Sequence, residues 1–264
     1  MPQPGPLTVV VRFLDREQAD NEVMRLGALV LAAAVTATAC GSPDGSRGNP
    51  GVGGQEPRTI PPFPQRPTAN ANPSTPTTGA GPRIVILGDS LTAGLGLPVG
   101  QSYPALLQQR LKDEGSSYQI VNAGVSGDTS AGGLSRLDWA LDGDVRVMIV
   151  ALGGNDGLRG LPAEQLKDNL AAIIKRAQAR GMTVILAGME APPNYGRDYI
   201  VAFHQVYPAL AKEYHVALVP FLLDGVAGRD ALNQPDGIHP SAAGARVVAD
   251  NVWKVLKPVV KTSR

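Results

Sequence analysis

Between residues 83 and 257, short apolar segments alternate with segments of helical periodicity. The apolar segments are 84–87, 119–121, 145–152, 183–187 and 217–221. Runs of apolar residues without polar alternation are typical of strands that are buried on both faces, as in a parallel sheet. Strands that alternate with helices form such a sheet and cover both of its faces with helices. We therefore predict a doubly wound, three-layer α/β/α domain with a five-stranded parallel sheet.

The segments between the predicted strands carry helix signals. Ser102 stands where it can cap a helix that has Pro104 in its first turn. The apolar residues expected on the inner face of this helix are Ala105, Leu106 and Leu111. Further helices are predicted at 130–141, 162–180, 198–214 and 242–256.

The N-terminal part of the chain has a different character. Residues 1–23 contain four acidic residues and make a poor export signal, whereas Met24 and Arg25 are followed by fourteen uncharged residues and then Cys40. That run is too short for a membrane span but fits the apolar region of a signal peptide behind a basic start. We therefore predict that 1–23 are a mis-called extension and that 24–40 are a signal peptide.

The end of this signal resembles a bacterial lipobox. The residues Ala37-Thr38-Ala39-Cys40 match its pattern except at Ala37, where Leu, Val or Ile is preferred. The lipobox interpretation predicts an exported lipoprotein that is held at the cell envelope by acyl chains on Cys40. The alternative is an ordinary signal that is cleaved near Ala39 and leaves an unpaired thiol.

Composition separates a tether from a domain and excludes some classes of function. Residues 41–82 contain 10 Pro and 8 Gly, which predicts a disordered tether ahead of a folded domain at 83–264. The net charge of +1 and the 5% aromatic content give no signature of nucleic-acid binding. Cys40 is the only cysteine, so the chain forms no intramolecular disulfide and no cysteine-based zinc site.

Four polar loops follow predicted strands, at 88–91, 122–127, 153–156 and 236–240. Because the carboxyl ends of parallel strands meet at one rim of a sheet, these loops should lie close together. They contain Ser90, a glycine N–H, the Asn155 amide and the pair Asp236-x-x-His239. A hydroxyl, hydrogen-bond donors, a base and a carboxylate that orients the base are what acyl transfer requires.

The four blocks together resemble the SGNH/GDSL hydrolase superfamily, which is named for a Ser, a Gly, an Asn and a His in separate blocks. Residues 152–160 and 236–240 are most similar to the branch of thioesterase I, lysophospholipase L1 and arylesterases. The resemblance implies a flavodoxin-like SGNH fold. It also implies a serine hydrolase that cleaves carboxylic esters or thioesters, with no metal or organic cofactor.

The resemblance also implies the roles of individual residues. Ser90 would be the nucleophile, His239 its general base and then the general acid, and Asp236 the partner of the imidazole. The N–H groups of Ser90 and Gly124 and the side-chain amide of Asn155 would form the oxyanion hole. Each of these residues also has a plain structural interpretation as a helix cap, a turn residue or a surface histidine.

Two other functions compete with the ester or thioester hydrolase. One is a carbohydrate O-deacetylase of the same superfamily, and the other is a lipid-anchored envelope protein that keeps the fold for binding alone. An acyl ester, a thioester or a lysophospholipid is the expected substrate, and an acyl-CoA is a poor fit for an exported protein. By its position, the segment 189–195 is expected to line the acyl pocket.

Overall fold

The computed structural model describes residues 81–262. The predictions for the extension at 1–23, for the signal peptide and Cys40, and for nearly all of the tether at 41–82 lie outside the described residues. No helix within 81–262 combines the length and the apolar character that a membrane crossing needs.

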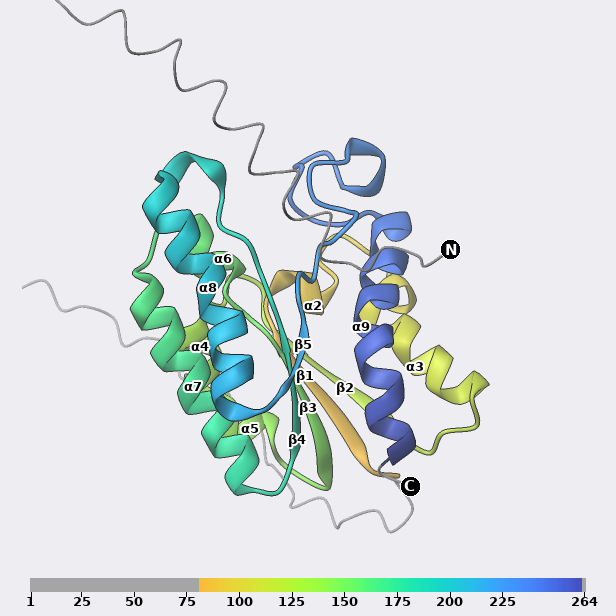
Figure 1. Ribbon diagram of the computed structural model, residues 1–264. Helices are drawn as coiled ribbons and strands as arrows, with labels where there is room; N and C mark the ends of the chain where they lie inside the picture. Colours follow the sequence, from red (N-terminus) through yellow and green to blue (C-terminus); the bar gives the residue numbers. More distant parts are fainter. Residues whose placement is uncertain (1–80, 263–264) are drawn as a thin grey trace, which may run out of the picture. The chain divides into compact units, whose positions relative to one another are not determined.

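The centre of the domain is a five-stranded, fully parallel sheet with the order β2-β1-β3-β4-β5 (Figure 1). The strands are β1 (Arg83–Gly88), β2 (Gln119–Gly124), β3 (Val145–Ala151), β4 (Thr183–Ala187) and β5 (Ala217–Val219). The chain adds β2 on one side of β1 and then β3 on the other. The direction of winding thus reverses between β1 and β3, where ligands of open α/β sheets bind, beyond the carboxyl ends of the strands. The predicted fold class is confirmed.

Helices cover both faces of the sheet (Figure 1). One layer is formed by α3 (Tyr103–Asp113) and α9 (Ala242–Thr262), which pack against each other. The opposite layer contains α4 (Ser130–Ser135), α5 (Leu137–Ala140), α7 (Ala163–Ala179) and α8 (Arg197–Tyr214). Between these two layers the four residues 84–87 of β1 are fully buried, which explains why their sequence shows no polar alternation.

Shorter elements lie in the loops around the sheet. They are α2 (Ser90–Ala93), α6 (Gly154–Leu158), η2 (Val99–Gln101), η3 (Pro193–Tyr195) and η4 (Asp230–Leu232). The first two begin two residues after the end of β1 and three residues after the end of β3. They therefore place their residues at the point where the winding reverses.

Two elements differ from the prediction in ways that affect the site. Strand β2 continues three residues beyond Val121, because Asn122, Ala123 and Gly124 pair with the last residues of β1. The single helix predicted at 130–141 is two helices, α4 and α5, which are separated at Arg136. Two consecutive glycines in α4 weaken helix propagation there, since glycine costs about 1 kcal/mol relative to alanine.

The details of α3 also differ from the prediction. Ser102 occupies the N-cap position, but its hydroxyl donates to the carbonyl of Val99 and makes no capping bond to the helix. The buried face of α3 is formed by Tyr103, Pro104, Leu107 and Leu111, so Ala105 and Leu106 are only partly covered. At the other end of the chain, α9 extends six residues past the predicted end at Leu256.

Candidate active site

Ser90, His239 and Asp236 are joined by side-chain hydrogen bonds, although Ser90 and His239 are 149 residues apart in the chain. The Oγ of Ser90 lies 2.8 Å from His239 Nε2, and His239 Nδ1 lies 2.7 Å from Asp236 Oδ2. Because a carboxylate only accepts hydrogen bonds, the imidazole proton belongs on Nδ1. The Nε2 atom is then a free base that accepts the hydroxyl proton of Ser90. The sequence-predicted nucleophile, base and carboxylate are thus brought together.

The short loop that carries Asp236 and His239 is held by the carboxylate itself. Asp236 Oδ1 accepts the backbone N–H of His239 at 3.0 Å and that of Ile238 at 2.9 Å. These two bonds and the imidazole bond lower the pKa of Asp236 to about 2, with the His239 N–H as the largest cause. Asp236 is therefore a carboxylate at neutral and mildly acidic pH.

Ser90 is the first residue of α2, directly beyond the end of β1. Asp89 precedes it as the N-cap of this helix, and its Oδ1 accepts the N–H of Leu91 at 3.0 Å. The backbone N–H of Ser90 has no hydrogen-bond partner among residues 81–262. At the start of a helix such an N–H is an available donor for a negatively charged oxygen.

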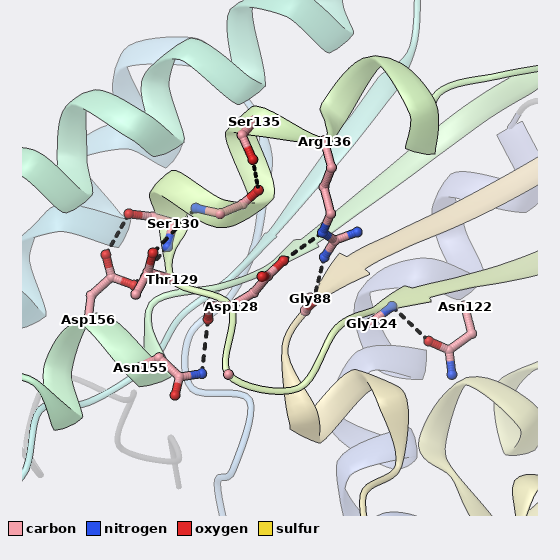
Figure 2. A network of polar contacts seen from close by, with 12 residues as sticks. Gly88, Asn122, Gly124, Asp128, Thr129, Ser130, Ser135, Arg136, Asn155 and Asp156 are labelled. Atoms are coloured by element: carbon pink, nitrogen blue, oxygen red, sulfur yellow. Dashed lines mark hydrogen bonds and ion pairs between the residues drawn. The ribbon is translucent and has the colours of Figure 1, made fainter. Parts of the chain in front are cut away.

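Asn155 follows β3 in the first turn of α6. One hydrogen of its Nδ2 atom is donated to the backbone oxygen of Asp128 at 2.9 Å (Figure 2). The amide nitrogen carries two hydrogens, so one donor remains. Asn155 and Ser90 line the same cleft, so the predicted amide donor and the predicted nucleophile face one cavity.

Gly124 does not fit its predicted role. It is the last residue of β2, and its N–H donates to Asn122 Oδ1 at 3.0 Å (Figure 2). A Cβ atom at this position would lie 2.2 Å from the backbone nitrogen of Ala93. Gly124 is therefore a glycine because α2 packs directly on this end of β2. Its N–H is used inside the strand and does not reach the cleft.

The glycine that lines the cleft is Gly127 and not the predicted Gly124. The turn 125–128 is closed by a hydrogen bond from the N–H of Asp128 to the oxygen of Val125, and Gly127 is its third residue. Its φ of 86° lies in the left-handed region that favours glycine at this position of a turn. Gly127 lines the cleft, and its N–H is unpartnered within the described part of the chain. Its sequence signal was the turn pattern Ser126-Gly127-Asp128.

A cleft of about 530 Å³ opens beside Ser90 and His239. Its walls are mainly apolar and include Leu95, Leu158, Met189, Ala191, Pro192, Pro193, Phe221, Leu223 and Ile238. Residues 189–193 lie along one wall, as expected from their position in the sequence. A cleft of this size with a mainly apolar lining suits an acyl chain.

Comparison with known proteins decides which family this arrangement belongs to. Residues 86–247 match the model of the GDSL-like lipase/acylhydrolase family. The chain belongs to this family. Esterase TesA of Pseudomonas aeruginosa is 49% identical over 178 residues, which are 67% of this chain and 89% of the relative. The thioesterase 1/protease 1/lysophospholipase L1 of Escherichia coli K12 is 41% identical over 178 residues, or 67% and 84% of the two chains.

Solved structures agree with this membership. The crystal structure of TesA is 50% identical, covers 67% of this chain and 98% of its own, and has a TM-score of 0.65. The esterase AlinE4, described as an SGNH-hydrolase family esterase, is 42% identical with a TM-score of 0.58, and the match covers 69% and 98% of the two chains. The predicted superfamily and the predicted class of enzyme, a hydrolase, are confirmed.

The ionisable side chains that line the cleft of this GDSL-like hydrolase are Asp89, Glu190 and His239. Glu190 lies on the apolar wall, and its Oε1 is 2.7 Å from Nδ1 of His204 on α8. Residues 81–262 contain no group of three or more His, Cys, Asp or Glu side chains that could hold a metal ion.

Asp89 is a buried carboxyl, only 2% exposed, and its burial raises its pKa to about 6. An unfolded chain would release this proton near the ordinary value of 3.8. Between about pH 4 and pH 6 the folded protein therefore binds more protons than the unfolded chain. The free energy of unfolding should fall across this window as the pH rises.

Asp89→Asn is expected to remove this pH dependence, because an amide does not titrate. It should also raise the free energy of unfolding at pH 7 by about 3 kcal/mol, since the protein no longer buries a charged carboxylate and the amide oxygen can still accept the N–H of Leu91. Urea unfolding at pH 4.5 and pH 7 measures both effects. Asp168→Asn, an exposed change on α7, is the control. An equal increase in the free energy of unfolding at the two pH values would contradict the assignment of the pH dependence to Asp89.

Proposed function

We propose that the protein hydrolyses carboxylic esters and thioesters through a covalent acyl-enzyme on Ser90. The observation that carries this proposal is the chain of hydrogen bonds from Ser90 Oγ to His239 and on to Asp236, set beside a large apolar cleft. Such a chain converts a weakly nucleophilic hydroxyl into an alkoxide-like nucleophile at the moment of attack.

Acylation begins when Ser90 Oγ attacks the carbonyl carbon of the substrate and His239 Nε2 takes the hydroxyl proton. The electron pair of the C=O bond moves onto the oxygen and gives a tetrahedral oxyanion. Collapse of this intermediate breaks the bond to the alcohol or thiol, which leaves with the proton from Nε2. Asp236 stabilises the imidazolium that exists between these two steps.

The oxyanion would be held by the N–H groups of Ser90 and Gly127 and by the remaining Nδ2 hydrogen of Asn155. All three residues line the same cleft and come from segments that follow β1, β2 and β3. Donors that are fixed before the reaction need no reorganisation when the negative charge develops. Deacylation repeats the same steps with water in place of Ser90 and regenerates the free hydroxyl.

The apolar cleft and the names of the relatives favour simple acyl substrates. One relative is an arylesterase of Vibrio mimicus, 36% identical over 67% of this chain and 89% of its own, and another is named as a thioesterase and lysophospholipase. Aryl esters, acyl thioesters and lysophospholipids share an acyl group that the apolar wall at 189–193 can cover. A sugar substrate would instead need a polar groove.

A panel of substrates tests this function on the purified protein. p-Nitrophenyl acetate, butyrate and octanoate and butyrylthiocholine would be assayed beside acetylated xylan. The proposal expects turnover of the aryl esters and of the thioester, with kcat/KM rising from acetate to the longer chains. Turnover of acetylated xylan in preference to every aryl ester would identify a deacetylase. No turnover of any substrate by folded protein would leave only a binding function.

We also propose that the protein is exported and anchored to the cell envelope through acyl chains on Cys40. The support is the apolar run after Met24 and Arg25, which ends at the lipobox-like Ala37-Thr38-Ala39-Cys40. A diacylated cysteine would provide the two chains that stable anchoring requires. The region 41–82 would then act as the tether of the catalytic domain.

Expression of the chain from Met24 in a bacterial host, with an alkyne-labelled fatty acid in the medium, tests the anchor. The protein is expected to carry the label and to sediment with membranes, and Cys40→Ser should lose both properties. Ser42→Ala, a neighbouring change that leaves the cysteine in place, is the control. Unlabelled protein that is exported and released would support the ordinary signal peptide instead.

A further inference from the structure

Arg136 lies at the break between α4 and α5, and its side chain reaches two of the segments that form the site. Its Nε atom donates to Asp128 Oδ2 at 2.6 Å, and its Nη2 atom donates to the backbone oxygen of Gly88 at 2.8 Å (Figure 2). Asp128 follows Gly127 in the turn beyond β2, and Gly88 is the last residue of β1, two positions before Ser90. One guanidinium group thus joins the end of β1 to the turn beyond β2.

The third segment of the site is joined through Asp128. Its side-chain carboxylate binds Arg136, and its backbone oxygen accepts the amide of Asn155, which follows β3. Each of the three connected segments contributes one oxyanion donor, namely the N–H of Ser90, the N–H of Gly127 and the Nδ2 of Asn155. The mutual position of these donors therefore depends on contacts that converge on the pair of Arg136 and Asp128.

The ion pair of Arg136 and Asp128 is largely shielded from water. The side chains of Arg136 and Asp128 are only 16% and 18% exposed, so water screens their attraction weakly. The planar guanidinium directs its two donors at fixed angles toward the carboxylate and the carbonyl, which a lysine ammonium cannot reproduce. Without Arg136, the carboxylate of Asp128 would be left without its cation in a poorly solvated place.

The turn also has a direct backbone bond to β1, from the N–H of Val125 to the oxygen of Gly88 at 3.0 Å, but this bond involves neither Gly127 nor Asp128. The other side-chain contacts of the turn do not replace the connection through Arg136. Arg159 donates to the oxygen of Gly127 at 2.8 Å, but this contact is exposed and does not reach β1. Asp156 accepts hydrogen bonds from the N–H and the hydroxyl of Ser130 and so holds the start of α4. These bonds involve neither Gly88 nor the turn at 125–128. Among the residues that the structure describes, Arg136 is the side chain that bonds to both Gly88 and the turn at 125–128.

We propose that Arg136 is a positioning residue for the oxyanion hole, which it sets by tying Asp128 to Gly88. This inference rests on the proposed ester hydrolysis at Ser90. Arg136 touches neither the substrate nor the reacting atoms, and it lies outside the lining of the cleft. Its removal should therefore weaken binding of the transition state and leave binding of the ground-state ester nearly unchanged.

The test compares Arg136→Lys with the wild type on p-nitrophenyl butyrate. The expected result is a fall in kcat of about 10-fold to 100-fold with a change in KM of less than about 2-fold, because small displacements of oxyanion donors act on the transition state. Arg180→Lys is the matched control, since Arg180 pairs with Asp138 of α5 at an exposed site. It should change kcat by less than about 2-fold.

A double-mutant cycle with Asn155→Ala separates positioning from general loosening of the fold. If Arg136 acts by placing the donors, Arg136→Lys should lower kcat by less in the Asn155→Ala background than in the wild type. Equal factors in both backgrounds, or an increase in KM at constant kcat, would overturn the proposal. Thermal unfolding of each variant shows whether it is folded under the assay conditions.

A second variant covers the case in which Arg136→Lys does not fold. Asp128→Asn keeps the backbone oxygen that binds Asn155 but weakens the bond to Arg136, and it is expected to show the same fall in kcat with KM retained. Normal kcat in this variant would also overturn the proposal. If the wild type itself turns over no ester, the proposed function fails and this inference fails with it; a working wild type with unaffected variants contradicts the inference alone.

Discussion

Replacement of Ser90 by alanine is expected to lower kcat/KM for p-nitrophenyl butyrate by about 10⁴-fold to 10⁶-fold. The substitution removes the single atom that would form the acyl-enzyme and leaves the donors of the oxyanion hole in place. Labelling by a fluorophosphonate probe should disappear at the same time, because this reagent forms its bond with an activated serine Oγ. Steady-state kinetics and in-gel fluorescence measure the two effects on the same preparations.

The control for this prediction is Ser117→Ala. Ser117 is exposed and precedes the amino end of β2, whereas the site lies at the carboxyl ends of the strands. It should keep both the activity and the label. His239→Ala is expected to cost about as much as Ser90→Ala, and the double variant little more, because the two side chains act as one unit. Labelling of Ser90→Ala at the wild-type rate would mean that another residue is the nucleophile.

Asp236→Asn should lower kcat/KM by about 10³-fold to 10⁴-fold, less than the loss of Ser90 or His239. Asp236 Oδ1 binds the N–H groups of Ile238 and His239, so the amide oxygen of an asparagine would take that place. The amide NH₂ would then face His239 Nδ1, a donor where the wild type has an acceptor. This favours the tautomer with its proton on Nε2, which cannot take the proton of Ser90.

Kinetics from pH 5 to pH 9 test this prediction, with Asp230→Asn on η4 as a nearby control. The hydrogen bonds to Asp236 keep its pKa at about 2, so protonation of Asp236 should not contribute to any loss of activity above pH 5. The variant should retain its fold and its fluorophosphonate label at a much lower rate of labelling. A loss smaller than 10-fold would show that His239 is oriented by other groups.

The predictable part of the site consists of residues whose roles depend on short stretches of chain. Ser90 comes three residues after an apolar run that is typical of a buried strand, which placed it at the rim of the predicted sheet. Asp236 and His239 are three residues apart, so their contact is made within one turn and needs little from the rest of the fold. The alternation of strands and helices likewise predicted the parallel sheet and its two helical layers.

The oxyanion hole was harder to predict, because its geometry depends on pairing between distant segments. Asn122, Ala123 and Gly124 are not distinctly strand-forming, and they join β2 only because the end of β1 lies beside them. That pairing uses Gly124 inside the strand and leaves Gly127, three residues later, in the turn that faces the cleft.

The sequence by itself determined the fold class and the reactive residues, since both follow from local periodicity and from motifs at strand ends. Only the tertiary structure decided which glycine N–H lies in the cleft. In the sequence, Arg136 looks like one polar residue within the helix predicted at 130–141. In the tertiary structure it lies where that helix is interrupted, and it bonds to Asp128 and to Gly88, which is 48 residues away. Hydrogen bonds over such separations depend on how the layers pack, and local sequence does not encode that packing.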